Sequence, residues 1–341
     1  MTHLHVLDGG LGVSVQDRGR VGYRALGVPV SGALDPLLLA AANALAGAPA
    51  DAAALEILLH GPRLQAADGP VRVALAGAGA SRVLRGDGSA EPLPPWRSAT
   101  LTPGDILAVG RVEAGVAVLA VSGGMTVPVV LGSRATYARA GLGGIAGRPI
   151  QAGDRLPCGA APDGPERVGP PWRLPAGPLR VIAGPQREHV DEACFAAFLA
   201  GPWTVTPAAD RMGARLAGPR LTHSARGAEI VTDGVTPGAI QVPADGQPIL
   251  LRADCQTTGG YPKIATVIAA DLPRLGHLRP GDTLSFSAVD AAAAARARQE
   301  QARLFAAWRA ALSALPPAGG FDATALYAAN LVGGVLRGDE D

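Results

Sequence analysis

Leu101-Thr102-Pro103-Gly104-Asp105-Ile106-Leu107 occurs a second time, with few changes, as Leu278-Arg279-Pro280-Gly281-Asp282-Thr283-Leu284. Each copy follows an Asp-Gly pair, Asp68-Gly69 or Asp245-Gly246, by the same number of positions. Both Asp-Gly pairs lead into strand-length apolar segments. A pattern that returns at a constant spacing indicates internal duplication, although Gly153-Asp154 shows that a Gly-Asp turn also occurs outside the repeat. The sequence therefore predicts two related β domains.

The composition favours the same mainly β class. Of the 341 residues, 48% are hydrophobic and only 17% are charged, and the chain contains 46 glycines and 30 prolines. Such a composition is typical of many short strands separated by tight turns. The length also suits two domains better than one.

The expected domain organisation follows from where turn-forming and helix-forming residues gather. We predict an N-terminal β-barrel domain over residues 1–160, a linker over 161–178, a C-terminal β-barrel domain over 179–289, a helix over 290–315 and a tail over 316–341. The C-terminal helix is expected because its segment is rich in Ala, Arg, Gln and Leu, and Pro316-Pro317 would stop it. A shorter helix is expected from Asp35 to Ala46, with Pro36 at its first position and Gly47 at its end.

Several function classes are disfavoured by the sequence. The formal net charge of +1 leaves no basic face for a phosphate backbone, so nucleic acid is not an expected partner. Neither a signal-peptide pattern nor a membrane-spanning apolar run is found, so we expect a cytoplasmic protein without membrane contact. The three cysteines and six histidines lack the spacing of a metal site. Phosphate-binding P-loop, dinucleotide-loop and serine-hydrolase motifs are also missing.

Lys263 is the only lysine among 30 basic residues. An exposed lysine can be exchanged for arginine at little cost, because an exposed charge contributes little to stability. A site that needs a compact ammonium with three donors is not served by a planar guanidinium. Chance survival of one neutral lysine is the alternative, but the chemistry favours a functional role.

Lys263 ends the segment with the densest set of hydrogen-bonding groups, residues 254–263. Side-chain donors and acceptors at Gln256, Thr257 and Thr258 precede two glycines whose backbone N–H groups can approach a ligand closely. Such a loop can hold an oxyanion or a phosphate. The alternative is an ordinary polar turn between two strands.

Two Asp-Arg pairs could bind a substrate carboxylate through the guanidinium, Asp17-Arg18 and Asp210-Arg211. Gln241 lies in the same half of the chain as the second pair. Taken alone, each Asp-Arg pair is more often a surface ion pair than a binding site.

An ordered series of motifs resembles the biotin-dependent carboxyltransferase family over about residues 4–287. In the first half the matching segments are Val15-Gln16-Asp17-Arg18-Gly19-Arg20, Gly27-Val28-Pro29-Val30-Ser31-Gly32-Ala33-Leu34-Asp35, Ala54-Leu55-Glu56-Ile57 and Leu131-Gly132-Ser133-Arg134-Ala135-Thr136. In the second half they are Gly184-Pro185-Gln186, Asp210-Arg211-Met212-Gly213, Gly238-Ala239-Ile240-Gln241-Val242-Pro243 and Gln256-Thr257-Thr258-Gly259-Gly260-Tyr261-Pro262-Lys263. The family includes the C-type component of 5-oxoprolinase, the second component of allophanate hydrolase, the carboxyltransferase part of urea carboxylase and an antagonist of a sporulation kinase inhibitor.

The resemblance implies two cyclophilin-like β-barrels and a composite enzyme. The expected partners are a homologue of the carboxyltransferase-like B component, possibly the A component, and a small amide substrate. The expected function is that of the C component in an ATP-dependent 5-oxoprolinase, with ATP used in the assembled complex. One alternative is a biotin-dependent carboxyltransferase component acting on urea or another amide; this chain contains neither a biotin carboxylase nor a carrier domain. The other is a non-catalytic antagonist of a kinase inhibitor, since one fold serves several functions.

The resemblance and the residue types together give the expected site. Its catalytic residues would be Lys263, Gln256, Thr257, Thr258 and Tyr261, with Lys263 stabilising negative charge. Its substrate-binding residues would be Asp210, Arg211, Gln241, Gly259, Gly260, Asp17, Arg18 and Ser31, with Arg211 or Arg18 holding the substrate carboxylate.

Overall fold

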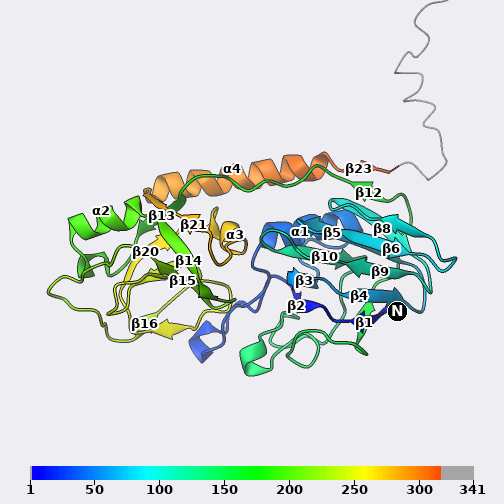
Figure 1. Ribbon diagram of the computed structural model, residues 1–341, viewed down its shortest axis with the longest axis horizontal. Helices are drawn as coiled ribbons and strands as arrows, with labels where there is room; N and C mark the ends of the chain where they lie inside the picture. Colours follow the sequence, from blue (N-terminus) through cyan, green and yellow to red (C-terminus); the bar gives the residue numbers. More distant parts are fainter. Residues whose placement is uncertain (1, 316–341) are drawn as a thin grey trace, which may run out of the picture.

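The computed structural model describes residues 2–315 and contains two β domains side by side (Figure 1). The long helix α4 (Ala291–Ala310) runs along the top of both domains in this view. The predicted mainly β fold with two β domains and a C-terminal helix is confirmed. Within these residues no helix is both long enough and apolar enough to cross a membrane.

The N-terminal domain consists of two sheets that enclose one core. The six-stranded sheet has the order β11 (Arg155–Cys158), β1 (Thr2–Asp8), β4 (Arg63–Ala66), β9 (Ile106–Val109), β6 (Ser81–Leu84) and β7 (Ala90–Pro92). The seven-stranded sheet has the order β2 (Leu11–Gln16), β3 (Ala54–His60), β10 (Ala117–Val121), β5 (Val71–Gly77), β8 (Arg97–Leu101), β12 (Arg167–Val168) and β23 (Ser313–Ala314). Buried aliphatic side chains from both sheets fill the space between them, among them Leu64, Leu75 and Leu107.

Strand β5 illustrates how the sequence sets the layers of this domain. Val71, Val73 and Leu75 belong to the core between the sheets. Ala74 and Ala76 point the other way, because successive strand residues face opposite sides of a sheet. They belong to a second core with helix α1 (Pro36–Ala46). The small alanine side chains let the helix lie close to the sheet.

Helix α1 begins and ends where the sequence predicts. The Asp35 carboxylate accepts hydrogen bonds from the backbone N–H groups of Leu37 and Leu38, each at 2.9 Å. Pro36 occupies the first helical position, and Gly47 ends the helix with a φ of 78°. These signals are local, so they could be identified from the sequence.

The C-terminal domain is a nearly closed barrel. Its strand order is β21 (Thr283–Leu284), β14 (Trp203–Ala209), β15 (Gly213–Ala217), β18 (Ile249–Leu251), β17 (Ala239–Gln241), β20 (Lys263–Val267), β13 (Leu179–Ala183) and β22 (Phe286–Ala288). Only Ser285 separates the two end strands in the chain, so the sheet comes back to its own start. Helix α2 (Glu192–Ala200) contributes Phe198, whose ring stacks on Phe286 with centroids 4.5 Å apart.

Smaller elements complete both domains. They are α3 (Leu272–Leu275), the paired strands β16 (Asp233–Gly234) and β19 (Thr258–Gly259), and the short 3-10 helices η1 (Arg24–Leu26), η2 (Ala138–Ala140) and η3 (Arg187–His189).

The repeated Pro-Gly-Asp stretch forms the same turn in both domains. The Asp105 carboxylate accepts from the Thr102 N–H at 2.8 Å, and Asp282 accepts from the Arg279 N–H at 2.7 Å. The glycine before each aspartate has a φ above 90°, a conformation that favours glycine. Asp154 closes a third turn of this kind, with Oδ2 2.9 Å from the Gln151 nitrogen. The turn is therefore a local motif that precedes three strands, β9, β11 and β21.

The C-terminal helix is shorter than predicted. It begins after Asp290, whose carboxylate accepts from the Ala293 N–H at 2.6 Å, but it ends at Ala310 rather than at Leu315. The next residues form β23, which pairs with β12 inside the predicted linker. The open edge of the seven-stranded sheet supplies hydrogen-bond partners there, which a prediction from helix propensity does not include. The predicted tail lies outside the described residues.

Candidate functional site

Lys263 is the first residue of β20, and its side chain lies inside the C-terminal domain. The side chain is only 5% exposed, and Nζ is 2.9 Å from Asp233 Oδ2. The Asp233 carboxylate is 56% exposed, and the hydrogen bond from Lys263 lowers its pKa. An ammonium has three donors, and within residues 2–315 Nζ has no second partner. Two N–H groups therefore remain available to a ligand.

Gln241 lies beside Lys263 because the two residues are paired between β17 and β20. Its side chain is buried, and its Nε2 atom has no hydrogen-bond partner among the described residues. Its Oε1 atom is 3.4 Å from Gln256 Nε2. A Cβ atom at Gly259 would lie 2.6 Å from Gln241 Nε2, so only glycine leaves room for this amide. A buried donor without a partner is costly, and a bound water or ligand would satisfy it.

The rest of the predicted loop holds this arrangement through its backbone. The Thr257 carbonyl accepts from the Val235 N–H, and the Gly260 carbonyl accepts from the Ile230 N–H. Thr258 belongs to β19, which pairs with the strand that carries Asp233. The Thr258 and Tyr261 side chains are exposed.

Two residues of this site were not predicted, Asp233 and Gln186. Gln186 Oε1 accepts from the Lys263 N–H at 3.2 Å, and the Gln186 N–H donates to the Lys263 carbonyl at the same distance. Gln186 lies in one of the motifs that carry the family resemblance, which was the available signal. Asp233 had no comparable signal, because only the pairing of β16 with β19 brings it to Lys263.

A second group of predicted residues lies between the two domains. Arg211 Nε is 2.9 Å from Asp254 Oδ2, and the guanidinium also bonds Glu56 of the N-terminal domain. Asp254 in turn accepts from the Ser31 hydroxyl, which also belongs to the N-terminal domain. Although burial disfavours a charged guanidinium, Glu56 and Asp254 raise the pKa of Arg211. The network is a set of charged hydrogen bonds that joins the domains.

This network leaves Arg211 little capacity for a substrate. Its Nη2 atom donates to the Gly32 carbonyl and to Asp254, in addition to the bonds from Nε and Nη1. Four of the five N–H groups of a guanidinium are therefore engaged. The geometry favours a structural role for Arg211 and leaves Arg18 as the more accessible guanidinium.

The other predicted aspartates hold loops. Asp17 is 9% exposed and accepts from the Gly19 N–H at 2.7 Å and the Ser133 hydroxyl at 2.6 Å. Asp210 is exposed, accepts from the Met212 N–H at 2.8 Å, and forms an ion pair with Arg139 at 3.2 Å. Within residues 2–315, neither the Asp17 carboxylate nor the Asp210 carboxylate forms a hydrogen bond or an ion pair with Lys263.

Arg18 borders two cavities. One of about 320 Å³ lies in the N-terminal domain and is also lined by Asp51 and Arg134. The other, of about 210 Å³, lies between the domains and is lined by Ser31 and Arg252. The structure thus brings Lys263, Gln241, Gln256 and Gly259 together, and groups Arg211 and Ser31 separately at the domain interface. Among the described residues no cluster of His, Cys, Asp and Glu is arranged to hold a metal.

Comparison with known proteins gives consistent relatives. A family model described as carboxyltransferase domain, subdomain A and B, matches residues 26–288. The chain is 39% identical to the C subunit of 5-oxoprolinase from Escherichia coli (strain K12), covering 90% of this chain and 98% of that protein. It is 34% identical to the protein of the same name from Haemophilus influenzae, covering 87% and 94%. It is 30% identical to urea amidolyase of Lachancea kluyveri, covering 84% of this chain and only 17% of that protein.

Solved structures give the same grouping. The crystal structure of the K. lactis urea amidolyase matches with a TM-score of 0.80 at 29% identity, covering 89% of this chain and 20% of that chain. The crystal structure of the Kluyveromyces lactis urea carboxylase matches with a TM-score of 0.80 at 30% identity, covering 89% and 29%. The fold is therefore shared with segments of much longer enzymes.

Proposed function

Because the chain belongs to the carboxyltransferase domain family with subdomains A and B, we propose that it is the C subunit of an ATP-dependent 5-oxoprolinase. In this role it acts with A and B subunits to open the cyclic amide 5-oxoproline to glutamate. The observation that carries the proposal is the similarity to the E. coli protein along nearly the whole of both chains.

The reaction must overcome the resonance of the lactam amide. In the proposed sequence the lactam oxygen attacks the γ-phosphorus of ATP, and ADP leaves. Water adds to the activated ring carbon, the ring C–N bond breaks, and a second water releases phosphate and glutamate. Negative charge develops on the oxygens around the ring carbon, and fixed donors aimed at such atoms are usually the largest single contribution to catalysis.

We assign that contribution to Lys263 and Gln241. Within residues 2–315, two N–H groups of the Lys263 ammonium and the Nε2 group of Gln241 have no partner, and the two residues lie next to each other in a buried site. Burial strengthens their interaction with an oxyanion. Gln256 orients the Gln241 amide through its oxygen. For the substrate carboxylate we propose Arg18, which lines the cavity between the domains, because Arg211 is engaged in the network that joins them.

ATP is assigned to the assembled complex and not to a defined site in this chain. The sequence has no P-loop. The part of the reaction proposed for this chain is therefore recognition and polarisation of the lactam.

The test is to co-express the chain with its homologous A and B subunits, purify the complex, and measure ADP and glutamate together. The proposal predicts that 5-oxoproline stimulates ADP release with one glutamate formed for each ADP. A stable complex whose ADP release does not respond to 5-oxoproline would contradict it.

Carboxyl transfer to an amide such as urea is the second candidate. It is supported by the urea amidolyase relatives. The same donors, Lys263 and Gln241, fit the ureido oxygen of biotin, which when bound supplies the carboxyl group. This function predicts turnover that requires bicarbonate and a biotinylated carrier, which the first function does not require.

A further inference from the structure

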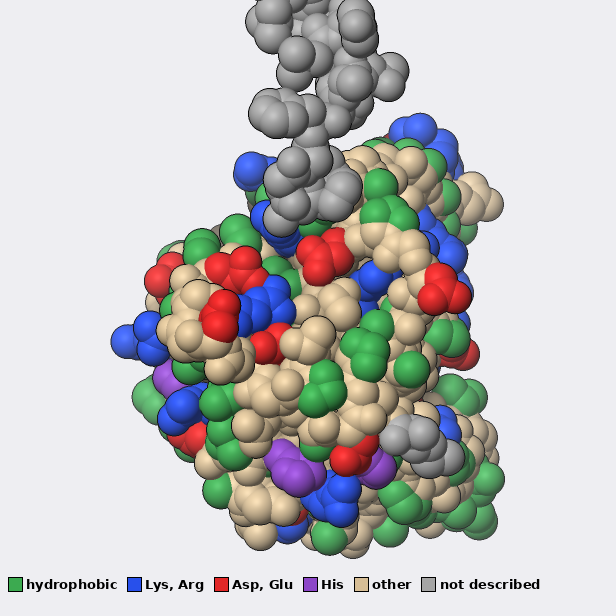
Figure 2. Space-filling view, turned by 90° about the vertical axis from the view of Figure 1, so that its right-hand side faces the viewer, with side chains coloured by type: hydrophobic (Ala, Val, Ile, Leu, Met, Phe, Trp, Pro, Cys, Tyr) green, Lys and Arg blue, Asp and Glu red, His purple; other side chains and the backbone are tan. Residues whose placement is uncertain are grey.

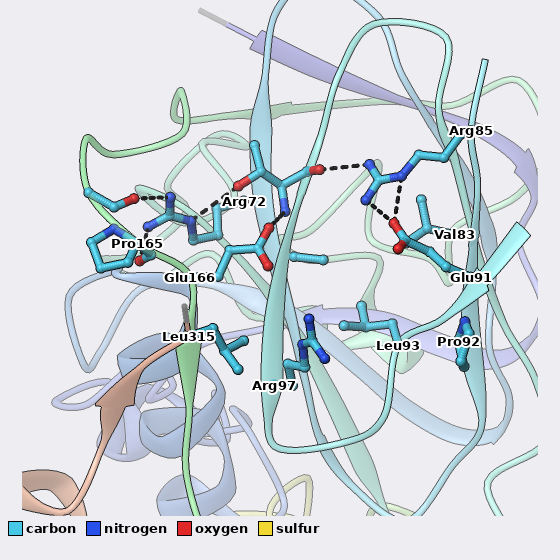
Figure 3. A pocket seen from close by; sticks show the side chains of 13 residues that line it. Arg72, Val83, Arg85, Glu91, Pro92, Leu93, Arg97, Pro165, Glu166 and Leu315 are labelled. Carbon is cyan, nitrogen blue, oxygen red and sulfur yellow. Dashed lines mark hydrogen bonds and ion pairs between the residues drawn. The ribbon is translucent and has the colours of Figure 1, made fainter. Parts of the chain in front are cut away.

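A cavity at the N-terminal domain is separate from the Lys263 site. It has a volume of about 550 Å³ and lies between the β6–β7 hairpin, strand β8, the linker segment 164–166 and Leu315. Its volume is in the range of small-molecule sites. Figure 3 shows side chains from these segments converging on one space.

Three arginines line this cavity, and they differ in their hydrogen-bond and ion-pair partners: Arg72, Arg85 and Arg97. Arg85 forms ion pairs with Glu91 and Asp105. Arg72 is 6% exposed and donates to the carbonyls of Gly164 at 2.7 Å and Pro165 at 3.0 Å, but within residues 2–315 it has no carboxylate partner. Among the described residues, the buried Arg72 guanidinium is thus bonded only to neutral groups.

Arg97 is the arginine with the most capacity for a ligand. Its guanidinium has neither a hydrogen bond nor an ion pair to any of the described residues, and in Figure 3 it points into the cavity between Leu93 and Leu315. A guanidinium in this position can bind a carboxylate through two parallel hydrogen bonds.

Glu166 supplies the opposite charge in the same cavity. Its Oε1 atom accepts from the Thr100 N–H at 2.6 Å, and within residues 2–315 its carboxylate is not part of an ion pair. Glu166 and Arg97 therefore face one space without bonding each other. Figure 2 shows that acidic and basic side chains also lie next to one another on the surface at this end of the molecule.

The apolar side chains of the cavity limit the class of ligand. Val83, Leu93 and Leu315 line the cavity beside these charged groups. A simple anion on Arg97 would leave the Glu166 carboxylate without a cationic partner. A ligand with a carboxylate, an ammonium and an aliphatic body matches the Arg97 guanidinium, the Glu166 carboxylate and the apolar side chains, respectively.

We propose that this cavity binds the zwitterion of an aliphatic α-amino acid, with its carboxylate on Arg97, its ammonium on Glu166 and its side chain against Leu93 and Leu315. All lining residues belong to the N-terminal domain, the linker and the segment after β23. The site is therefore distinct from the one proposed for the lactam, and it does not depend on the 5-oxoprolinase assignment.

Calorimetric titration of the full chain tests the proposal with three probes: L-leucine, 4-methylpentanoate, which lacks the ammonium, and 3-methylbutylamine, which lacks the carboxylate. L-Leucine is expected to bind at least tenfold more tightly than either analogue, because each charged contact is worth about tenfold or more. No binding of L-leucine, or equal binding of 4-methylpentanoate, would overturn the proposal.

Three variants assign the contacts. Arg97→Gln is expected to weaken the binding of L-leucine at least tenfold. Glu166→Gln keeps the acceptor for the Thr100 N–H. It is expected to weaken the binding of L-leucine by a similar factor and to leave the binding of 4-methylpentanoate unchanged. Unchanged binding of 4-methylpentanoate also shows that the variant is folded. Arg82→Gln is the matched control, because Arg82 precedes the cavity-lining Val83 and points to the other face of β6. Equal effects of Arg82→Gln and Arg97→Gln would contradict the assignment.

Discussion

Arg211 joins the two domains through a buried network of charged hydrogen bonds. Its guanidinium bonds Glu56 from one domain and Asp254 from the other, and Glu56 is only 1% exposed. Removing one partner of a buried charged network leaves the other charges without compensation, which is much more costly than losing a surface pair.

Arg211→Met is therefore expected to lower the free energy of unfolding by about 3–5 kcal/mol. Urea denaturation measures the change. Arg215→Met in the adjacent strand β15 is the control, because the ion pair between Arg215 and Asp245 is exposed on both sides. Arg215→Met should lower the free energy of unfolding by less than about 1 kcal/mol. Similar losses for the two variants would mean that the Arg211 network does not stabilise the fold.

At the scale of elements, the Gly-Asp turns fix the starts of strands through one carboxylate each. In the turn before β11, Asp154 accepts from Arg148 Nη1 at 2.8 Å and from Nη2 at 2.7 Å. The hydrogen bonds from Arg148, assisted by the Gln151 N–H, hold the pKa of Asp154 below its ordinary value of 3.8.

Asp154→Asn is expected to cost about 1–2 kcal/mol at pH 7. A carboxylate whose pKa is depressed in the folded state contributes stability above its unfolded pKa and loses it as pH falls through the folded value. The difference between wild type and variant should therefore be constant between pH 6 and pH 7 and shrink below about pH 4. Urea denaturation across this range measures it, and a difference that grows at low pH would contradict the account.

At the scale of the whole molecule, helix α4 ties the two domains together (Figure 1). Gln301 Nε2 donates to the Ala270 carbonyl beside the C-terminal barrel at 2.6 Å. Near the other end of the helix, Trp308 Nε1 donates to the Pro170 carbonyl at 2.7 Å, and the Trp308 ring contacts Trp96 of the N-terminal domain.

Trp308→Ala is expected to lower the free energy of unfolding by about 3–5 kcal/mol, because Trp308 is 7% exposed and its removal opens a cavity. Thermal and urea unfolding measure the loss. Leu304→Ala on the same helix is the control, since Leu304 is 45% exposed and its loss should stay below about 1 kcal/mol. A larger loss for Leu304→Ala than for Trp308→Ala would contradict the account, because it would mean that α4 packs mainly through the face that carries Leu304.

Local signals were sufficient for part of the fold and the site. The cap at Asp35 and the glycine at its end defined α1, and composition alone singled out Lys263. Contacts between distant segments were not predictable in the same way. The end of α4 depends on β12, and Asp233 reaches Lys263 only through strand pairing.

Arg211 illustrates the same limit. Its neighbour Asp210 made it resemble a carboxylate-binding arginine. Its partner Glu56 is 155 positions away in the chain, so its position between the domains was visible only in the folded structure.

The central claim is that the Lys263 ammonium acts on the substrate and does more than anchor Asp233. The most direct measurement is 5-oxoproline-dependent glutamate formation by the assembled complex carrying Lys263→Met or Asp233→Asn. Both variants break the same ion pair, but only the first removes the donors. We predict a loss of at least about 100-fold for Lys263→Met, the size typical of removing an oxyanion donor, and a loss below about tenfold for Asp233→Asn. Equal losses, or full activity of Lys263→Met, would contradict the claim.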